Sequence, residues 1–212
     1  MAHQHSLNVI SSLEGQQVFI TGASGFLGKA IVEKILREVP KIGRIYLLIR
    51  GSKRESAQQR AMEGVFGSSL FDVLRSEYGE GFEPFISEKV QVVEGELTQP
   101  MFGLDSPTFA GIASQLNLII NSAASVNFRE AMDQALEINT LCLNNIVALA
   151  NYKSAPQSVT PVVQVSTCYV NGLNQGVMRE EVAAPASGLI EAIDHDTYAI
   201  DTVIAKLQQK IE

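Results

Sequence analysis

The residues best suited to chemistry are three evenly spaced glycines near the N-terminus. They stand in the stretch VFITGASGFLGKA, residues 18 to 30, as Gly22, Gly25 and Gly28. A residue without a Cβ lets the backbone approach a phosphate closely, and the N–H groups at a helix start favour an anion. The spacing is one residue wider than GxGxxG, but it still places glycines at the tight turn, the pyrophosphate contact and the helix–strand packing point. The segment therefore predicts a phosphate cradle.

Two other interpretations of these glycines are open. A nucleoside-triphosphate loop needs GxxxxGK followed by Ser or Thr, so that a hydroxyl can bind a metal ion. Here Ala23 occupies the position of the first glycine of that pattern, and Ala30 follows Lys29. Both departures argue against a triphosphate loop. A purely structural turn is the other alternative, and the strand-like residues before and the helical pattern after favour dinucleotide binding over it.

Arg50 bears on which dinucleotide is bound. A site for NAD expects an acidic residue about 20 positions after the glycines, where it bonds the ribose hydroxyls. The second apolar run ends instead at Arg50, and Lys53 and Arg54 follow it closely. A guanidinium can pair with the 2′-phosphate of NADP in a forked geometry. We predict NADP(H) rather than NAD(H); the alternative is an arginine that merely solvates a strand end.

The elements that must position these residues alternate along the chain. Five short β-type segments are predicted, at residues 18–21, 45–49, 90–97, 116–124 and 162–170. Helical periodicity is predicted between them, after Gly28 to residue 38, at 107–115 and at 130–152, and again at 190–212. Such alternation is typical of a Rossmann-type, doubly wound α/β sheet that is parallel.

The domain organisation follows from the same pass along the chain. Residues 1–14 are predicted to be a mobile tail, and 15–212 a single nucleotide-binding domain. Residues 51–89 are too long for an ordinary connection and are predicted to be a helical insertion. Six of its apolar residues could form an exposed face or, as we favour, a local satellite core: Phe66, Leu70, Phe71, Leu74, Phe82 and Phe85.

Composition excludes several function classes. The net charge of −7 argues against nucleic-acid binding, and no apolar run approaches the length of a membrane span. The N-terminus lacks the features of a secretory signal, and Cys142 and Cys168 match no metal or redox spacing. His3 and His5 are assigned to the tail. We expect no metal site, two free thiols, and a cytoplasmic protein that could associate peripherally with membranes.

The motifs TGASGFLG, LLIRG, GEL and NSAASVNF, in this order, resemble the extended short-chain dehydrogenase/reductase superfamily. More specific features are YLLIRG, the insertion before the third strand, NSAASVNFRE, EINTLCLNNI and VSTCYVNG. Within the superfamily, these resemble the fatty acyl-CoA reductase family, which is related to the male-sterility proteins and terminal thioester reductase domains. The resemblance implies NADPH as cofactor and a long-chain acyl-CoA or acyl thioester as substrate, reduced to aldehyde or alcohol. It also implies cofactor-binding residues in the glycine motif and at the ends of the second, third and fourth strands. These residues are Thr21, Gly22, Ser24, Gly25, Phe26, Leu27, Gly28, Arg50, Glu96, Leu97, Ala123 and Ala124.

The resemblance also implies roles near the substrate. Glu96 follows Gly95 where the family carries an aspartate at the adenine, and it is longer by one methylene. Asn139 matches an asparagine that positions the active-site segment. Thr167, or alternatively Ser166, matches a hydroxyl that bonds the substrate carbonyl, where it would stabilise developing negative charge; strand-end capping is the other interpretation of this pair.

The superfamily's Tyr-x-x-x-Lys pair is absent. None of the five tyrosines has a lysine four positions later. The favoured interpretation is that the chain is the N-terminal, cofactor-binding portion of a longer reductase and binds NADPH without turnover. The alternatives are a non-catalytic NADP(H) sensor and a module for partner binding or self-association through surfaces left by a missing lobe.

Overall fold

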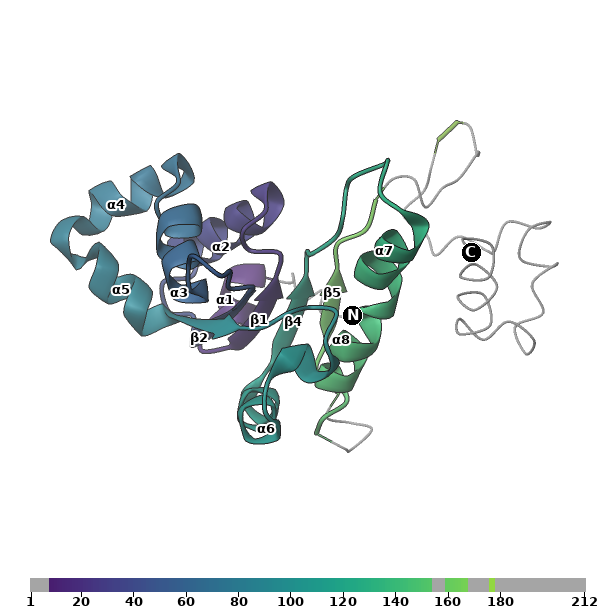
Figure 1. Ribbon diagram of the computed structural model, residues 1–212. Coiled ribbons are helices and arrows are strands. Elements are labelled where there is room, and N and C mark those ends of the chain that lie inside the picture. The colour runs from purple at the N-terminus through teal and green to yellow at the C-terminus, as the bar shows by residue number, and fades with distance from the viewer. Residues whose placement is uncertain (1–7, 154–158, 168–175, 178–212) are drawn as a thin grey trace.

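The five strands form one parallel sheet in the computed structural model, which describes residues 8–153, 159–167 and 176–177 (Figure 1). The strands are β1 (Gln17–Thr21), β2 (Arg44–Ile49), β3 (Val90–Glu94), β4 (Leu118–Asn121) and β5 (Val162–Gln164). Their order is β3-β2-β1-β4-β5, and every neighbouring pair is parallel. The predicted doubly wound α/β fold is confirmed. The strand order reverses between β1 and β4, so a crevice is expected at the carboxyl ends of these two strands.

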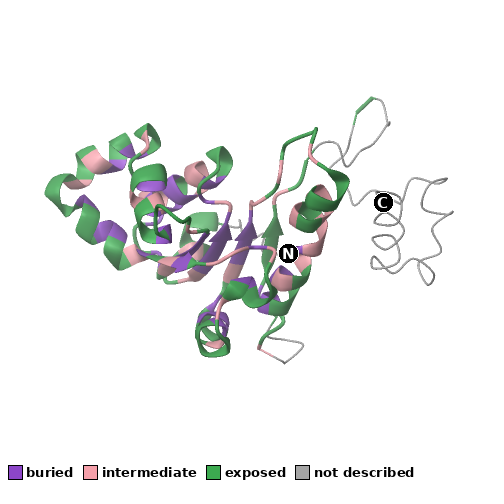
Figure 2. Cartoon of the chain, in the orientation of Figure 1, coloured by how far each residue is buried: buried purple, intermediate pink, exposed green. Residues whose placement is uncertain are grey.

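The central strands β1, β2 and β4 are buried because both faces of the sheet are covered there. Val18, Phe19 and Ile20 of β1 are fully buried, and their side chains alternate between the two layers. Val18 and Ile20 join the cluster that contains α2 residues, whereas Phe19 joins the cluster on the opposite face. Figure 2 shows the central strands buried and β5 exposed. Continuous apolar runs therefore become strands that are buried on both sides.

The observed β3, β4 and β5 are shorter than predicted. The chain leaves regular pairing after Glu94, Asn121 and Gln164, although single backbone hydrogen bonds continue one residue further at Gly95 and Val165. The predicted end of the fifth strand, 168–170, lies outside the described residues, as do Cys168, His3, His5 and the predicted helix at 190–212.

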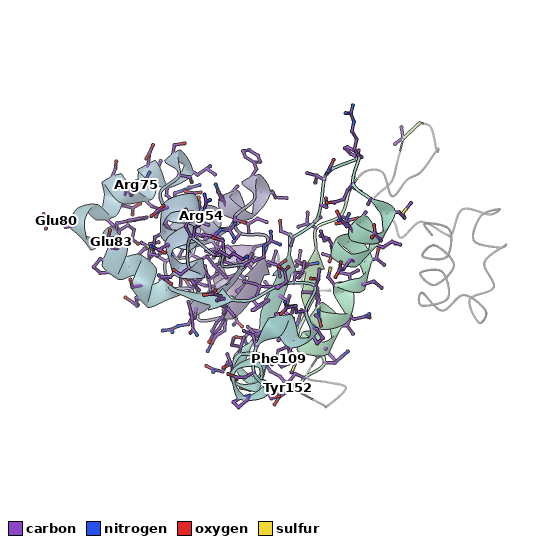
Figure 3. All side chains as sticks on the ribbon, in the orientation of Figure 1. Arg54, Arg75, Glu80, Glu83, Phe109 and Tyr152 are labelled. Atoms are coloured by element: carbon purple, nitrogen blue, oxygen red, sulfur yellow. The ribbon has the colours of Figure 1, made fainter. Side chains whose placement is uncertain are left out.

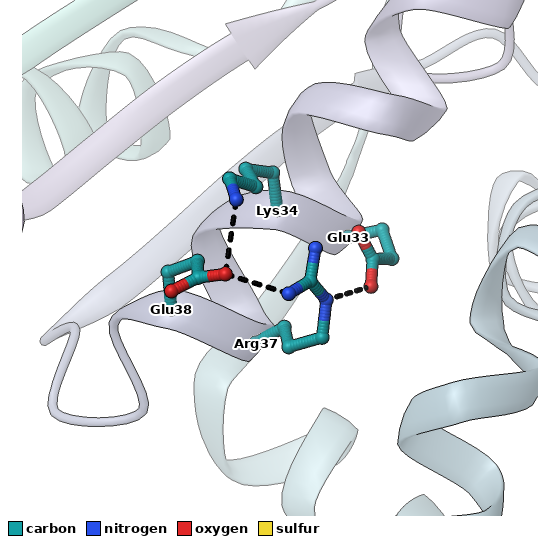
Figure 4. A network of polar contacts seen from close by, with 4 residues as sticks. All are labelled: Glu33, Lys34, Arg37 and Glu38. Atoms are coloured by element: carbon teal, nitrogen blue, oxygen red, sulfur yellow. Dashed lines mark hydrogen bonds and ion pairs between the residues drawn. The ribbon is translucent and has the colours of Figure 1, made fainter.

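The helices are divided between the two faces. One face carries α1 (Val9–Leu13), α2 (Phe26–Glu38) and the insertion, and the other carries α6 (Ser106–Gln115) and α8 (Leu143–Ala150). Along α2, Lys34 bonds the partly exposed Glu38 at 2.9 Å, and Arg37 bonds the buried Glu33 at 2.7 Å (Figure 4). Such pairs, one turn apart, stabilise a helix.

Two predicted segments differ in detail. Within the predicted tail, residues 9–13 form α1, whose first N–H groups bond the Asn8 side chain. The helix predicted at 130–152 is divided into α7 (Met132–Leu136), a π-helical turn (Glu137–Leu141) and α8. The spacing of apolar residues in the sequence is continuous through this segment. A π turn nevertheless adds one residue to the local helical repeat, and so it changes the direction of the side chains in that turn.

The insertion at 51–89 is helical throughout most of its length. It contains α3 (Ala57–Arg60), a π turn (Ala61–Phe66), a 3₁₀ turn (Ser69–Phe71), α4 (Asp72–Tyr78), a second 3₁₀ turn (Gly79–Gly81) and α5 (Phe82–Lys89). Pro84 lies in the first turn of α5, where a missing N–H costs nothing.

The insertion is part of the main core, which corrects the prediction of a satellite core. Five of the six apolar residues singled out from the sequence are buried, and they belong to the same cluster as the side chains of β1 and β2; of the six, only Leu70, at 37%, is exposed. Arg75, labelled in Figure 3, helps to fix the segment. Its guanidinium donates to the carbonyls of Phe66 and Ser68 and lies 5.9 Å from the Phe82 ring centroid. The alternative of an exposed apolar face on these six residues is wrong as well.

Candidate cofactor-binding site

Gly22 and Gly28 are required by the fold around the glycine turn. Gly22 follows β1 with φ +72°, and a Cβ there would lie 2.6 Å from the Ala123 nitrogen. A Cβ on Gly28, inside α2, would lie 2.1 Å from the Gly22 carbonyl oxygen. Real Cβ atoms do not approach backbone so closely, so any larger residue would force β1, α2 and β4 apart.

Gly25 is different, because packing does not require it. It is the N-cap of α2 with φ −77°, and a Cβ there would meet only the Gly22 oxygen, at 3.3 Å. Ser24, Gly25 and Phe26 are exposed, Phe26 to 86%. The first turn of the 13-residue α2 carries no acidic side chain. The helix therefore presents unpaired N–H groups and the positive end of its dipole at an open surface, which is an arrangement suited to an anion.

Thr21 connects the glycine turn to the end of β4. Its buried hydroxyl donates to the Asn121 side-chain oxygen and accepts the Ala123 N–H at 3.2 Å. The Asn121 amide in turn donates to the Gln164 side-chain oxygen on β5 at 2.8 Å. Asn121 and Gln164 were not among the predicted site residues. The detectable signal was a polar residue at the end of each of two apolar runs, LIIN and VVQ.

Asn139 holds the segment that follows β4. Its side-chain oxygen accepts the Ser125 N–H at 2.8 Å, and its amide donates to the Ser125 carbonyl at 3.1 Å. Asn139 lies in the π-helical turn, which directs it toward this segment. The two bonds fix the backbone just after Ala123 and Ala124, so the structure brings these predicted residues together beside the glycine turn.

Ser166 and Thr167 lie just beyond β5, at the same edge of the sheet. Both are exposed. The preceding residue, Val165, donates its N–H to the Asn121 carbonyl at 2.9 Å and accepts the Gln164 side-chain amide at 2.9 Å. Because β5 pairs with β4 and β4 with β1, these hydroxyls are two strands away from the glycine turn.

Arg50 and Glu96 meet at the opposite side of the crevice, at the ends of β2 and β3. The Arg50 Nη1 lies 3.1 Å from a carboxylate oxygen of Glu96, and the side chains are 71% and 27% exposed. Leu97, by contrast, is only 8% exposed and packs in the core, while its carbonyl accepts the Asn145 amide at 2.9 Å. Leu97 is thus placed to support the site rather than to face it.

The described part of the chain offers neither a metal-ligand cluster nor a membrane-spanning helix. There, no three or more histidine, cysteine, aspartate or glutamate side chains gather as a metal site would need. Nor does any helix in the described ranges combine the length and apolar character of a membrane span.

Known proteins match most of the length of this chain. Residues 20–210 match the family described as male sterility protein. The chain is 36% identical over 178 residues to "Fatty acyl-CoA reductase 2, chloroplastic" of Arabidopsis thaliana, covering 84% of this chain and 28% of that protein. It is 34% identical over 175 residues to the alcohol-forming fatty acyl-CoA reductase of Simmondsia chinensis, covering 82% of this chain and 35% of that protein.

A solved structure shows the same architecture. The terminal R domain from the myxalamid PKS-NRPS biosynthetic pathway aligns with a TM-score of 0.60 at 25% identity, covering 76% of this chain and 37% of that chain. The chain thus spans 28% to 37% of the length of these three proteins. The family match covers most of the chain, and the predicted resemblance is confirmed: this chain belongs to the male sterility protein family of NAD(P)-binding domains.

Proposed function

We propose that this chain is the NADP(H)-binding portion of a fatty acyl-CoA reductase, which reduces a long-chain acyl thioester to an aldehyde or alcohol. The relatives named above are fatty acyl-CoA reductases, and the family match over residues 20–210 includes the glycine turn. When bound, the nicotinamide cofactor would supply the hydride. The residues of this chain would hold it and orient the substrate.

The observation that carries the proposal is Gly25. Gly22 and Gly28 have steric reasons to be glycine, but the environment of Gly25 would accept a methyl group after a shift of a few tenths of an ångström. It stands at the open N-terminus of α2, beside the point where the strand order reverses. A glycine there suits the N-cap position and also permits the close approach of a phosphate to its backbone.

NADP(H) is proposed over NAD(H) because of Arg50. Its side chain is 71% exposed at the end of β2, at the side of the crevice where the adenosine ribose binds in doubly wound folds. Lys53 and Arg54 are exposed on the following loop. A fixed positive charge here favours a 2′-phosphate over a hydroxyl.

Thr167, or alternatively Ser166, is proposed to donate a hydrogen bond to the substrate carbonyl oxygen. As hydride adds to the carbonyl carbon, negative charge grows on that oxygen, and a positioned hydroxyl would stabilise it. Asn139 acts as a positioning residue through its two bonds to Ser125. The 212 residues contain no Tyr-x-x-x-Lys pair, so we propose cofactor binding without turnover by this chain.

Titration with NADPH and with NADH, followed by cofactor fluorescence and thermal shift, tests the proposal. We expect tighter binding of NADPH and no NADPH oxidation when a long-chain acyl-CoA is added. Binding of neither cofactor would refute the cofactor function, equal affinity would remove the Arg50 argument, and acyl-CoA-dependent oxidation would refute the lack of turnover.

A non-catalytic NADP(H) sensor of the same superfamily is the second candidate, since it too would keep the cofactor site without the tyrosine and lysine. The reading frame beyond residue 212 distinguishes the two: a Tyr-x-x-x-Lys shortly after it supports the reductase. We further propose a cytoplasmic location, peripheral to membranes, which cell fractionation would test. Self-association stays a prediction, to be tested by sedimentation.

A further inference from the structure

Arg50, the residue proposed to select the cofactor, forms an ion pair with the carboxylate of Glu96. Glu96 occupies a donor on Nη1 of Arg50 at 3.1 Å. A guanidinium carries five N–H donors, so a phosphate could approach another edge of the same group. It would then come close to the Glu96 carboxylate.

The backbone fixes both partners where they are. In the register of β2 and β3, Ile49 pairs with Glu94, so the residues that follow them leave the sheet at the same level. The Gly95 N–H still bonds the Ile49 carbonyl at 3.2 Å, and the Arg60 guanidinium donates to the Arg50 carbonyl. The backbone therefore sets the separation from which the two side chains start.

A left-handed turn holds Glu96 from the other side. Met101 and Phe102 have φ of +51° and +60°, which is costly for residues with a Cβ, and Gly103 follows at +74°. Phe102 is fully buried, and its carbonyl accepts the Glu96 N–H at 2.9 Å. The fold thus maintains an unfavourable backbone conformation that presents an acceptor to Glu96.

We propose that Glu96 is a specificity-determining residue that competes with the 2′-phosphate of NADP(H) for Arg50. This inference rests on the proposed cofactor function. When NADPH binds, either Glu96 releases Arg50 or the phosphate lies beside a carboxylate, and both outcomes weaken binding. NADH has no 2′-phosphate, so it leaves the pair undisturbed. Glu96 therefore lowers the preference for NADP(H) that Arg50 alone would give.

Glu96→Gln tests this competition, because glutamine has nearly the same shape without the charge. For an exposed pair of this kind, we expect the affinity for NADPH relative to that for NADH to rise roughly two- to fivefold at low ionic strength. The gain should shrink in high salt, which screens exposed charges. Glu55→Gln is the matched control: it removes the same charge from an exposed position in the neighbouring loop, and it should change neither affinity.

A double-mutant cycle separates the ion pair from a general charge effect. In an Arg50→Gln background, the second change Glu96→Gln should give no gain for NADPH. A gain that persists without Arg50, or one that is equal for NADPH and NADH, would overturn the inference while leaving the proposed cofactor function intact. Failure of the unchanged chain to bind either cofactor would refute that function and, with it, the inference. Unchanged thermal unfolding of each variant shows that the differences arise in binding.

Discussion

The three glycines of the turn should respond differently to the same added methyl group. Gly25→Ala places a Cβ 3.3 Å from the Gly22 oxygen in an ordinary backbone conformation. The main cost is that alanine is a poorer N-cap than glycine, about 0.5–1 kcal/mol. In a chain of this size, that cost lowers Tm by roughly 1–4 °C. The variant should therefore fold.

Gly28→Ala is the contrasting change. Its Cβ would lie 2.1 Å from the Gly22 oxygen, with the Ala23 Cα at 2.8 Å, and neither atom belongs to a flexible side chain. Overpacking of this severity costs about 3 kcal/mol or more. Gly28→Ala should therefore lose most of its stability or fail to fold. Gly111→Ala is the matched control, since it lies inside α6 with open space around it and should gain about 0.5–1 kcal/mol.

The cofactor affinity is the decisive measurement for Gly25→Ala. A methyl group at the phosphate would displace it from the backbone N–H groups, and a hydrogen bond to a charged group is worth about 1.5–3 kcal/mol. That loss corresponds to roughly 10- to 100-fold weaker binding of NADPH. Isothermal titration of the folded variant, checked by circular dichroism, measures it. Unchanged affinity would refute the reasoning and leave the glycines with a role in the turn alone.

Three further predictions concern residues around the site and the core. Asn139→Ala should remove both bonds to Ser125 and increase hydrogen exchange of the Ser125 amide by at least about tenfold, as measured by NMR; unchanged exchange would show that this contact is not formed. The pKa of Asp105 is lowered below its ordinary value of 3.8 by the Thr108 N–H bond at 2.7 Å. A lowered folded-state pKa stabilises the fold above the unfolded-state value, and this contribution is lost as pH falls through the folded-state value. An asparagine at position 105 caps the helix without titrating. The Tm of Asp105→Asn should therefore fall less than the Tm of the unchanged chain between pH 5 and pH 3, about one unit either side of the usual carboxyl pKa. An equal fall in Tm for both proteins would contradict this. Burial raises the pKa of the Cys142 thiol, so iodoacetamide should modify it slowly in the native protein and rapidly after denaturation, as followed by peptide mass spectrometry. Rapid native labelling would contradict the buried position.

The fold could be predicted from the sequence because its strands are continuous apolar runs. A segment such as VFIT must be covered on both faces, and alternation with helical patterns leaves a parallel sheet as the solution. The insertion was harder to predict. Its apolar residues were recognised, but their contact with β1 and β2 depends on how the segment folds back over the sheet, and spacing along the chain contains no information on that direction.

The candidate site was predicted in part. The glycine turn, Ala123 and Asn139 were named from motifs, and the structure brings them together at the carboxyl edge of the sheet. Asn121 and Gln164 were missed because a single polar residue ending an apolar run is common. Their bond joins β4 to β5 across 43 positions of sequence, so only the pairing of these strands reveals it.

The sequence by itself determined the alternation of strands and helices, the glycine spacing and the family resemblance, because these depend on residue types at short separations. The tertiary structure decided which glycine is not required by packing and what lies beside Arg50. Gly22, Gly25 and Gly28 look equivalent in the motif, but only two of them face backbone that excludes a Cβ. Arg50 and Glu96 are 46 positions apart, and their charges meet only because β2 and β3 pair in one register.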